Sequence, residues 1–318
     1  MTIVVVGGFL GAGKTTLIFA AARELERRGL KAAVVLNDQG ESLVDTQMAR
    51  QQGLAAEEVT GGCFCCNYSS LVEGIEALRA YAPDVIFAEP VGSCTDISAT
   101  VLYPLREAYR LAPFTVCVDR AQEANYLYEN QLAEADLVVY TKADLYGVRD
   151  GRSVSGKTGQ GVAAWLDEVL FGSLPVGSKT LDIDYAEYAR AEAELTWLNL
   201  SARIECDPPV SPSMLLGPMM DAIAAKLEIV HLKATDRSES GFVKAAVANG
   251  HEEVEGALDA SPARWHEVLI NLRTSGDPEM VRGVVEGTLP GRVVERQVAC
   301  FRPSAPRRFG VGGTYEHE

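Results

Sequence analysis

One stretch, residues 3–16, restricts the possible folds of this chain more than any other. The apolar run Ile3–Val6 is followed at once by Gly-Gly-Phe-Leu-Gly-Ala-Gly-Lys-Thr-Thr, which contains G-x-x-x-x-G-K-[ST] without a mismatch. In such a strand, loop and helix, glycines let backbone N–H groups wrap a polyphosphate, and the helix N-terminus adds free donors. Lys14 is expected to reach the β- and γ-phosphates, and the Thr15 hydroxyl to bind Mg²⁺. The residues predicted to hold a nucleoside triphosphate are Gly8, Gly11, Ala12, Gly13, Lys14, Thr15 and Thr16.

Short apolar strands alternate with amphipathic helices through the first half of the chain. Strands are expected at Ile3–Val6, Ala32–Leu36, Asp84–Ala88, Phe114–Val118 and Leu137–Tyr140. Helices are expected at residues 15–28, 69–80, 96–111, 123–132 and 161–170. Residues 46–58 are polar and poorly periodic, and we expect them to be mobile. The alternation predicts an α/β fold with a doubly wound, mostly parallel sheet that binds ligands at the carboxyl edge of its strands.

An acidic residue, Glu89, ends one of these predicted strands at the edge where the phosphate loop also lies. An acidic group there can hold Mg²⁺ through water or orient the water that attacks the γ-phosphate. Lys14 and Glu89 are therefore the candidate catalytic residues. The simpler alternative for Glu89 is a solvated acid at a strand end, because most carboxylates of globular proteins lie at the surface.

A second motif follows the strand expected at Leu137–Tyr140. The sequence Thr141-Lys142-Ala143-Asp144 resembles the guanine-reading pattern [NT]-K-x-D. Asp144 can accept hydrogen bonds from guanine N1–H and the 2-amino group, and the stem of Lys142 can cover the base. Downstream, the loop that begins at Ser155 resembles one that donates a backbone N–H to guanine O6. The two signals together, in this order after a phosphate loop, favour GTP over ATP.

Three cysteines, Cys63, Cys65 and Cys66, form the pattern C-x-C-C just before an expected helix. Since the helices of a parallel α/β unit begin at the carboxyl edge of the sheet, the thiols are expected beside the nucleotide. Three thiolates can bind one ion such as Zn²⁺ and leave a fourth tetrahedral position open, which suits transfer better than permanent structure. Asp38, Glu41 or a residue of a client protein could fill that position. A buried structural group and a redox thiol pair remain as alternatives.

Composition limits the partners and the compartment. The net charge of −15 argues against binding to nucleic acid or to an anionic membrane, and no apolar run reaches the roughly 18 residues of a membrane span. Because the first strand leads straight into the phosphate loop, a signal peptide is not expected, and we expect a cytoplasmic protein. Seven cysteines, an odd number with three clustered, indicate reduced thiols rather than a disulfide framework.

The length of 318 residues predicts two domains. We expect a nucleotide-binding domain at residues 1–172, a smaller α+β domain at 181–302 after a Gly-, Ser- and Pro-rich linker, and a flexible tail at 303–318. In and just before the second domain, helices are expected at 184–194, 213–228 and 278–288, and strands at 196–205, 230–234, 241–248, 267–273 and 292–301. This order is close to a β-α-β-β-α-β sandwich with an extra strand. We expect this domain to recognise a client.

Taken together, the phosphate loop, Gly62-Cys63-Phe64-Cys65-Cys66, Glu89-x-x-Gly92 and the Thr141–Asp144 motif resemble the CobW-type metallochaperone GTPases, relatives of the UreG and HypB nickel-insertion proteins. The resemblance covers about residues 1–170. It implies a P-loop GTPase fold and slow GTP hydrolysis with Mg²⁺ at the phosphates. It also implies delivery of Zn²⁺, Co²⁺ or a related ion to a client metalloprotein or a cobalt or corrinoid system. Relatives of this class dimerise across the nucleotide face, so the resemblance allows a homodimer.

The sequence departs from the family pattern at three places. The Asn-Glu-Phe-Gly-Glu loop of the family appears as Asn37-Asp38-Gln39-Gly40-Glu41, and Thr141 stands where Asn is usual. Only ten residues separate Asp144 from Ser155, so an element common in relatives is shortened or missing. The chain has four histidines and no histidine-rich tract, which gives no support to a large metal-storage role.

Two other functions remain open at this level. The first is a P-loop kinase or ATPase that acts on a small acceptor and uses its cysteines only for structure. The second is a metal sensor or buffer in which the nucleotide is regulatory. A kinase predicts a phosphorylated product and no exchangeable metal, whereas a sensor predicts tight metal binding with turnover that does not respond to the metal.

Overall fold

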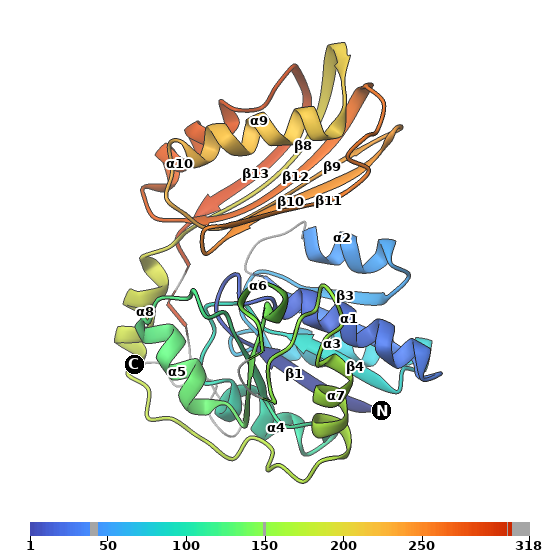
Figure 1. Cartoon of the computed structure of the whole chain (residues 1–318). Helices are drawn as coiled ribbons and strands as arrows, with labels where there is room; N and C mark the ends of the chain where they lie inside the picture. The colour runs from blue at the N-terminus through green and yellow to red at the C-terminus, as the bar shows by residue number, and fades with distance from the viewer. Residues whose placement is uncertain (39–43, 149–150, 304, 307–318) are drawn as a thin grey trace. The chain divides into compact units, whose positions relative to one another are not determined.

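The computed structural model describes residues 1–38, 44–148, 151–303 and 305–306. By its internal contacts the chain divides into two compact units. Unit 1 consists mainly of Met1–Gln39 and Asp45–Ala189, and unit 2 mainly of Arg190–Ser304. Figure 1 shows a parallel sheet with helices around it in unit 1, and a second sheet with helices on one face in unit 2.

The sheet of unit 1 runs in the order β3-β2-β4-β1-β6-β7, and its paired neighbours are parallel. These strands are β1 (Thr2–Gly7), β2 (Ala32–Asn37), β3 (Ala55–Val59), β4 (Val85–Glu89), β6 (Thr115–Val118) and β7 (Leu137–Tyr140). The central β1 is apolar on both faces, and Ile3 to Val6 are at most 1% exposed, as expected for a strand covered by helices on both sides. The predicted α/β fold with a mostly parallel sheet is confirmed.

Helices lie between and after these strands. They are α1 (Lys14–Arg27), α2 (Val44–Gln51), α3 (Tyr68–Leu78), η1 (Arg79–Tyr81), η2 (Ser98–Leu102), α4 (Tyr103–Leu105), α5 (Tyr126–Glu134), α6 (Ala143–Tyr146), α7 (Val162–Phe171) and α8 (Tyr185–Ala193). In α1 the buried side chains Leu17, Ala21 and Leu25 recur at helical spacing and face the sheet. Among the described residues, no helix combines the length and the apolar character that a bilayer crossing needs.

Two sequence-based predictions for unit 1 are wrong. Residues 46–58 are not a mobile segment, because most of them form α2 and the edge strand β3, which pairs along β2 from Ala55 to Val59. A helix does not continue to residue 111 either. The segment forms the π-helix η2 and the short α4, and β5 (Arg110–Leu111) then pairs with the start of β1. In both segments a short strand forms because its backbone pairs with a neighbouring strand, and the periodicity of the local sequence does not predict such pairing.

Unit 2 is an antiparallel sheet in the order β11-β10-β9-β12-β8-β13. Its strands are β8 (Thr196–Val210), β9 (Ile229–Ser238), β10 (Gly241–Ala248), β11 (His251–Gly256), β12 (Ala263–Thr274) and β13 (Arg292–Phe301). The helices α9 (Pro212–Ala224) and α10 (Pro278–Glu286) cover one face (Figure 1), and alternate strand residues such as Leu200, Ala234 and Ile270 fill the core between them. The predicted smaller α+β region is confirmed, with β11 as an additional strand that the sequence did not indicate.

Candidate functional site

The phosphate loop joins β1 to α1, and its shape depends on glycine. Gly8 has a φ of +130°, and a Cβ at this position would lie 2.4 Å from the carbonyl oxygen of Cys117. Gly13 precedes α1 with a φ of +82°, a left-handed conformation that other residues rarely adopt. Between them, Gly11 also has a positive φ, and the N–H of Ala12 donates to the Phe9 carbonyl over 3.1 Å. The chain therefore makes a tight loop in front of a helix N-terminus, where anions bind.

Lys14, the first residue of α1, lies inside this loop and is only 6% exposed. Its Nζ donates to the carbonyl oxygens of Gly8 at 2.9 Å and Phe9 at 3.2 Å, and lies 3.9 Å from Oε1 of Glu89. These partners fix the ammonium group within the loop. The result is a buried positive charge at the place where the motif predicts phosphate oxygens, to which such a charge binds strongly.

Thr15 and Glu89 come from different elements and meet beside this lysine. The hydroxyl of Thr15 donates to Oε1 of Glu89 over 3.0 Å, and both residues are buried. Glu89 is the last residue of β4, which pairs with β1 in parallel, so the two strands deliver the carboxylate and the loop to the same edge. A hydroxyl and a carboxylate are oxygen ligands of the kind that Mg²⁺ prefers. The chemistry of this pair therefore fits the predicted ion.

The predicted base-reading residues lie next to one another. Oγ of Ser155, which is fully buried, donates to Oδ1 of Asp144 over 2.6 Å. The next residue, Gly156, packs directly on α1, because a Cβ there would lie 2.6 Å from the carbonyl carbon and oxygen of Thr16. The loop from Ser155 thus connects the base motif to the first turn of α1. The exposed carboxylate of Asp144 and the loop at Ser155 are thereby held beside the phosphate loop.

Two residues that were not among the predicted site residues hold the base motif in place. Asp119 follows β6, is 1% exposed, and binds Nζ of Lys142 over 2.6 Å. The hydroxyl of Thr141 lies 2.8 Å from the carbonyl oxygen of Ala12 and 3.0 Å from that of Val118, and its single proton can serve one of them at a time. Both residues directly follow an apolar strand, a position too common to identify them from the sequence, and Thr141 stood in the predicted base motif with no role assigned to it.

The three cysteines of the C-x-C-C pattern lie in the turn between β3 and α3. Their three sulfur atoms all lie within 4.8 Å of one another, and among the described residues they form a candidate metal-binding group. Cys63 and Cys65 are buried and Cys66 is partly exposed. The sulfur of Cys66 lies 3.2 Å from that of Cys63 and 3.8 Å from that of Cys65. The turn therefore gathers the sulfurs closely enough for one ion to contact all three.

One expectation about these cysteines is wrong. They were predicted to be reduced, and the structure joins Cys63 and Cys65 in a disulfide while Cys66 keeps its thiol. The physical reason is that the turn places the two side chains on the same side, with their Cα atoms 5.3 Å apart, within the range of disulfide geometry. Three thiolate ligands are available to a metal only after this bond is reduced. Of the two carboxylates predicted to complete the site, Asp38 follows β2 and Glu41 lies outside the described residues.

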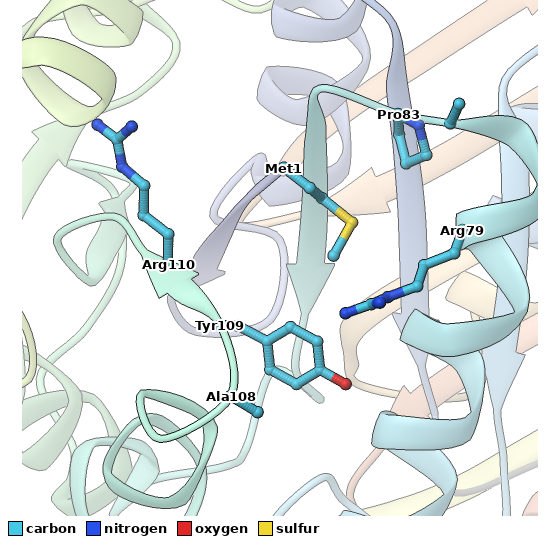
Figure 2. A pocket seen from close by; sticks show the side chains of 7 residues that line it. Met1, Arg79, Pro83, Ala108, Tyr109 and Arg110 are labelled. Atoms are coloured by element: carbon cyan, nitrogen blue, oxygen red, sulfur yellow. The ribbon is translucent and has the colours of Figure 1, made fainter.

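Two of the cavities lined by described residues lie at opposite ends of the strands of unit 1. One, of about 580 Å³, adjoins the base motif and is lined by Asp119, Tyr140 and Tyr146 among others. Burial, with the hydrogen bond and the charge of Asp119, raises the pKa of Tyr146 to about 12, so its hydroxyl stays protonated at neutral pH. The other cavity, of about 440 Å³, is drawn in Figure 2, where the side chains of Arg79 and Tyr109 point toward one another. It contains none of the predicted site residues.

The family comparison agrees with this arrangement of motifs. A family model described as "CobW/HypB/UreG, nucleotide-binding domain" matches residues 2–161, just over half of the chain. The match begins with β1 and ends at the start of α7, so it contains the phosphate loop, the cysteine turn, Glu89 and the base motif. Unit 2 lies beyond it.

The chain is also similar to individual relatives. It is 32% identical to the zinc chaperone YeiR of Escherichia coli K12 over 148 residues. This alignment covers 43% of this chain and 45% of YeiR. It is 30% identical over 186 residues to the zinc chaperone CobW of Pseudomonas aeruginosa, covering 45% of this chain and 49% of that protein. The chain thus spans less than half the length of each. The chain is also similar to a solved structure of HypB from Helicobacter pylori in complex with nickel. The match covers 51% of this chain and 82% of the HypB chain, with 19% identity and a TM-score of 0.40.

Proposed function

We propose, from the premise that the chain belongs to the CobW/HypB/UreG nucleotide-binding domain family, that it is a GTP-hydrolysing metallochaperone. In this proposal the nucleotide state controls the binding and delivery of a transition metal held by Cys63, Cys65 and Cys66. The observation that carries it is the close grouping of these three cysteines in the same unit as a complete phosphate loop. In a family of nucleotide-binding metal-handling domains, such a pairing is best explained by coupling between the two sites.

Each nucleotide-site residue has a separate role in the proposal. Lys14 would neutralise charge on the β- and γ-phosphates, and Thr15 would help to hold a Mg²⁺ ion that supplies further positive charge there. Glu89, already hydrogen-bonded to Thr15, holds that ion through water or orients the attacking water. Lys142 covers the guanine ring and Asp144 accepts from its N1–H and 2-amino groups. Adenine offers no matching pair of donors, so the proposal includes a preference for GTP.

The metal site is proposed to work as three thiolates with one open position. Zn²⁺ accepts thiolate ligands in tetrahedral geometry, and a site with three protein ligands leaves one position for an exchanging group. The names of the two relatives above, both zinc chaperones, support zinc. Thiolates also bind Co²⁺, and metal availability selects between such ions in cells. Reduction of the Cys63–Cys65 disulfide is a condition for this binding.

Unit 2 is proposed to recognise the client that receives the metal, and the homodimer is proposed as one state of the protein. The basis for the first is that unit 2 has its own sheet and apolar core, as a separate recognition module requires. The client would be a metalloprotein, or a cobalt or corrinoid system.

The test is to measure GTP affinity and hydrolysis on metal-stripped, reduced protein, alone and with one equivalent of Zn²⁺ or Co²⁺. A tenfold change in GTP affinity caused by either ion corresponds to a coupling free energy of about 1.4 kcal/mol between the sites. The variant with Ser at positions 63, 65 and 66 should bind GTP normally and lose the response to metal. A matched control is Cys300→Ser, which changes a thiol of unit 2 and should keep the response.

Each other outcome favours one of the competing functions. If the metal response survives in the triple Ser variant, the cysteines do not couple the sites and the proposal is wrong. No metal binding together with a phosphorylated small acceptor would identify a kinase. Tight metal binding with unchanged turnover would identify a metal sensor.

A further inference from the structure

Asn37, the last residue of β2, binds the cysteine turn through both ends of its side-chain amide. Its Nδ2 donates to the carbonyl oxygens of Val59 at 2.9 Å and Gly62 at 2.7 Å. Its Oδ1 accepts from the backbone N–H of Phe64 over 2.9 Å. The residue is 8% exposed, so these bonds form with little competition from water and are costly to break.

These bonds enclose the first metal-ligand candidate. Gly62 and Phe64 are the residues directly before and after Cys63, so one amide holds the backbone on both sides of it. The turn then closes through the Cys63 carbonyl, which accepts from the N–H groups of Cys66 at 2.9 Å and Asn67 at 2.8 Å. The path of the chain that gathers the sulfurs is thus fixed by backbone bonds and one side chain. None of these contacts involves a sulfur atom.

No other common residue could make the same set of bonds at this position. An aspartate has the same size but no N–H donor for the two carbonyl groups, and it would place a negative oxygen against them. Glutamine has both functions on a side chain that is one methylene longer. Asn37 therefore supplies two donors and one acceptor at the reach that the turn requires.

The same residue lies next to the nucleotide edge. In the parallel pairing of β2 with β4, Leu36 lies opposite Glu89, which accepts a hydrogen bond from the Thr15 hydroxyl. Asn37 is the following residue, and it lies opposite Val59 in the pairing with β3. A continuous series of paired strands therefore joins the predicted Mg²⁺ ligands to the cysteine turn.

We infer that Asn37 is a positioning residue of the metal site: its amide holds the turn in the form that brings the three sulfurs to one ion. The inference rests on the proposed function, and it assigns Asn37 no contact with the metal or the nucleotide. Outer partners that orient metal ligands in this way commonly contribute a factor of about 10 to 100 to metal affinity.

The experiment compares wild type with Asn37→Asp and Asn37→Ala in the reduced, full-length protein. Zn²⁺ affinity is measured by competition with a chelator, Co²⁺ binding by the thiolate-to-cobalt charge-transfer band, and GTP affinity by direct titration. We expect both variants to bind Zn²⁺ about 10- to 100-fold more weakly and to give a weaker cobalt–thiolate band. GTP affinity should stay within about twofold, which also shows that the variants fold.

The control is Asn125→Asp, because Asn125 caps α5 by accepting from the N–H of Tyr128 and a carboxylate can keep that bond. It should leave metal and GTP binding unchanged. Wild-type metal affinity and an unaltered cobalt band in both Asn37 variants would refute the inference. So would an equal loss of GTP and metal binding, which would make Asn37 a residue of the general fold. A wild-type protein without a cobalt–thiolate band would instead overturn the proposed function itself.

Discussion

The carboxyl group of Glu134 makes the stability of unit 1 depend on pH in a direction that can be measured. This residue of α5 has no exposed surface. Burial raises its pKa and the charge of Asp96 adds to this, while hydrogen bonds from the Ser98 N–H at 3.0 Å and the Thr95 hydroxyl at 3.2 Å lower it; the net result is a pKa raised from 4.5 to about 8. The folded protein therefore keeps a proton on Glu134 at neutral pH.

The sign of the effect follows from which state holds the proton. Between pH 4.5 and about 8 the folded carboxyl is protonated while the unfolded one is ionised. Unfolding releases a proton in this interval, so the free energy of unfolding falls as the pH rises, by about 1.4 kcal/mol per pH unit. Over the whole interval the loss is about 5 kcal/mol, and it is complete above the folded pKa.

Glu134→Gln removes the ionisation and keeps the shape of the side chain. Its carboxamide oxygen can still accept from the Ser98 N–H, and its NH₂ group can donate to the Thr95 hydroxyl. The variant should therefore match wild type within about 1 kcal/mol at pH 5. At pH 8.5 it should be more stable by about 4 kcal/mol, because the wild type has then lost its bound proton.

The assay is urea unfolding at pH 5 to 8.5, followed by tryptophan fluorescence, which includes the buried Trp165 of unit 1. Both units contribute to the signal, so the informative quantity is the difference between variant and wild type at each pH. Glu129→Gln is the control, since Glu129 is an exposed carboxylate on the same helix. A constant difference between Glu134→Gln and wild type across this range would refute the reasoning, because it would show that Glu134 binds no extra proton in the folded state.

Three further predictions concern other residues. Lys14→Ala should weaken GTP binding about 10- to 100-fold, because hydrogen bonds to charged groups contribute about 1.5–3 kcal/mol; unchanged affinity by titration would overturn the phosphate-site assignment. Asp144→Asn should weaken GTP without improving ATP, and equal affinities of wild type for both nucleotides would contradict a guanine site. Asp236→Asn should destabilise unit 2 by about 3 kcal/mol, because it replaces with a neutral amide the carboxylate that pairs with the buried His266, whose Nδ1 lies 2.6 Å from Asp236 Oδ2. Urea unfolding tests this, and unimpaired stability would mean that the pair contributes little.

The sequence predicted those parts of unit 1 whose structure depends on nearby residues. Glycine conformations, the start of α1 and buried strands such as β1 are set within a few positions along the chain, and they lie where the pattern placed them. The edge strand β3 and the short strand β5 were missed because their stability comes from partners distant in the sequence. β5 has only two residues, and its pairing with Thr2 and Ile3 cannot be seen in its own composition.

The candidate site follows the same division. The sequence identified residues with distinctive chemistry, such as Lys14 and the three cysteines. It did not identify the residues that hold them, because a single Asn, Asp or Thr after a strand is common and has no spacing rule. Asn37 and Asp119 are recognisable only once the strands are aligned and their side chains are seen to reach the next loop.

The structure also gives a physical account of the departure at Thr141, where relatives usually have Asn. Its hydroxyl lies within hydrogen-bond distance of the Ala12 carbonyl, so this position joins the base motif to the phosphate loop. Such a role needs a short side chain with a donor, which Thr and Asn both provide. The two residues proposed to contact the base, Lys142 and Asp144, are the ones that keep the pattern, and each has its own partner in Asp119 or Ser155. The departure therefore falls at the connection between the two motifs, while the two residues proposed to contact guanine keep the pattern, and the GTP preference remains the proposal to test.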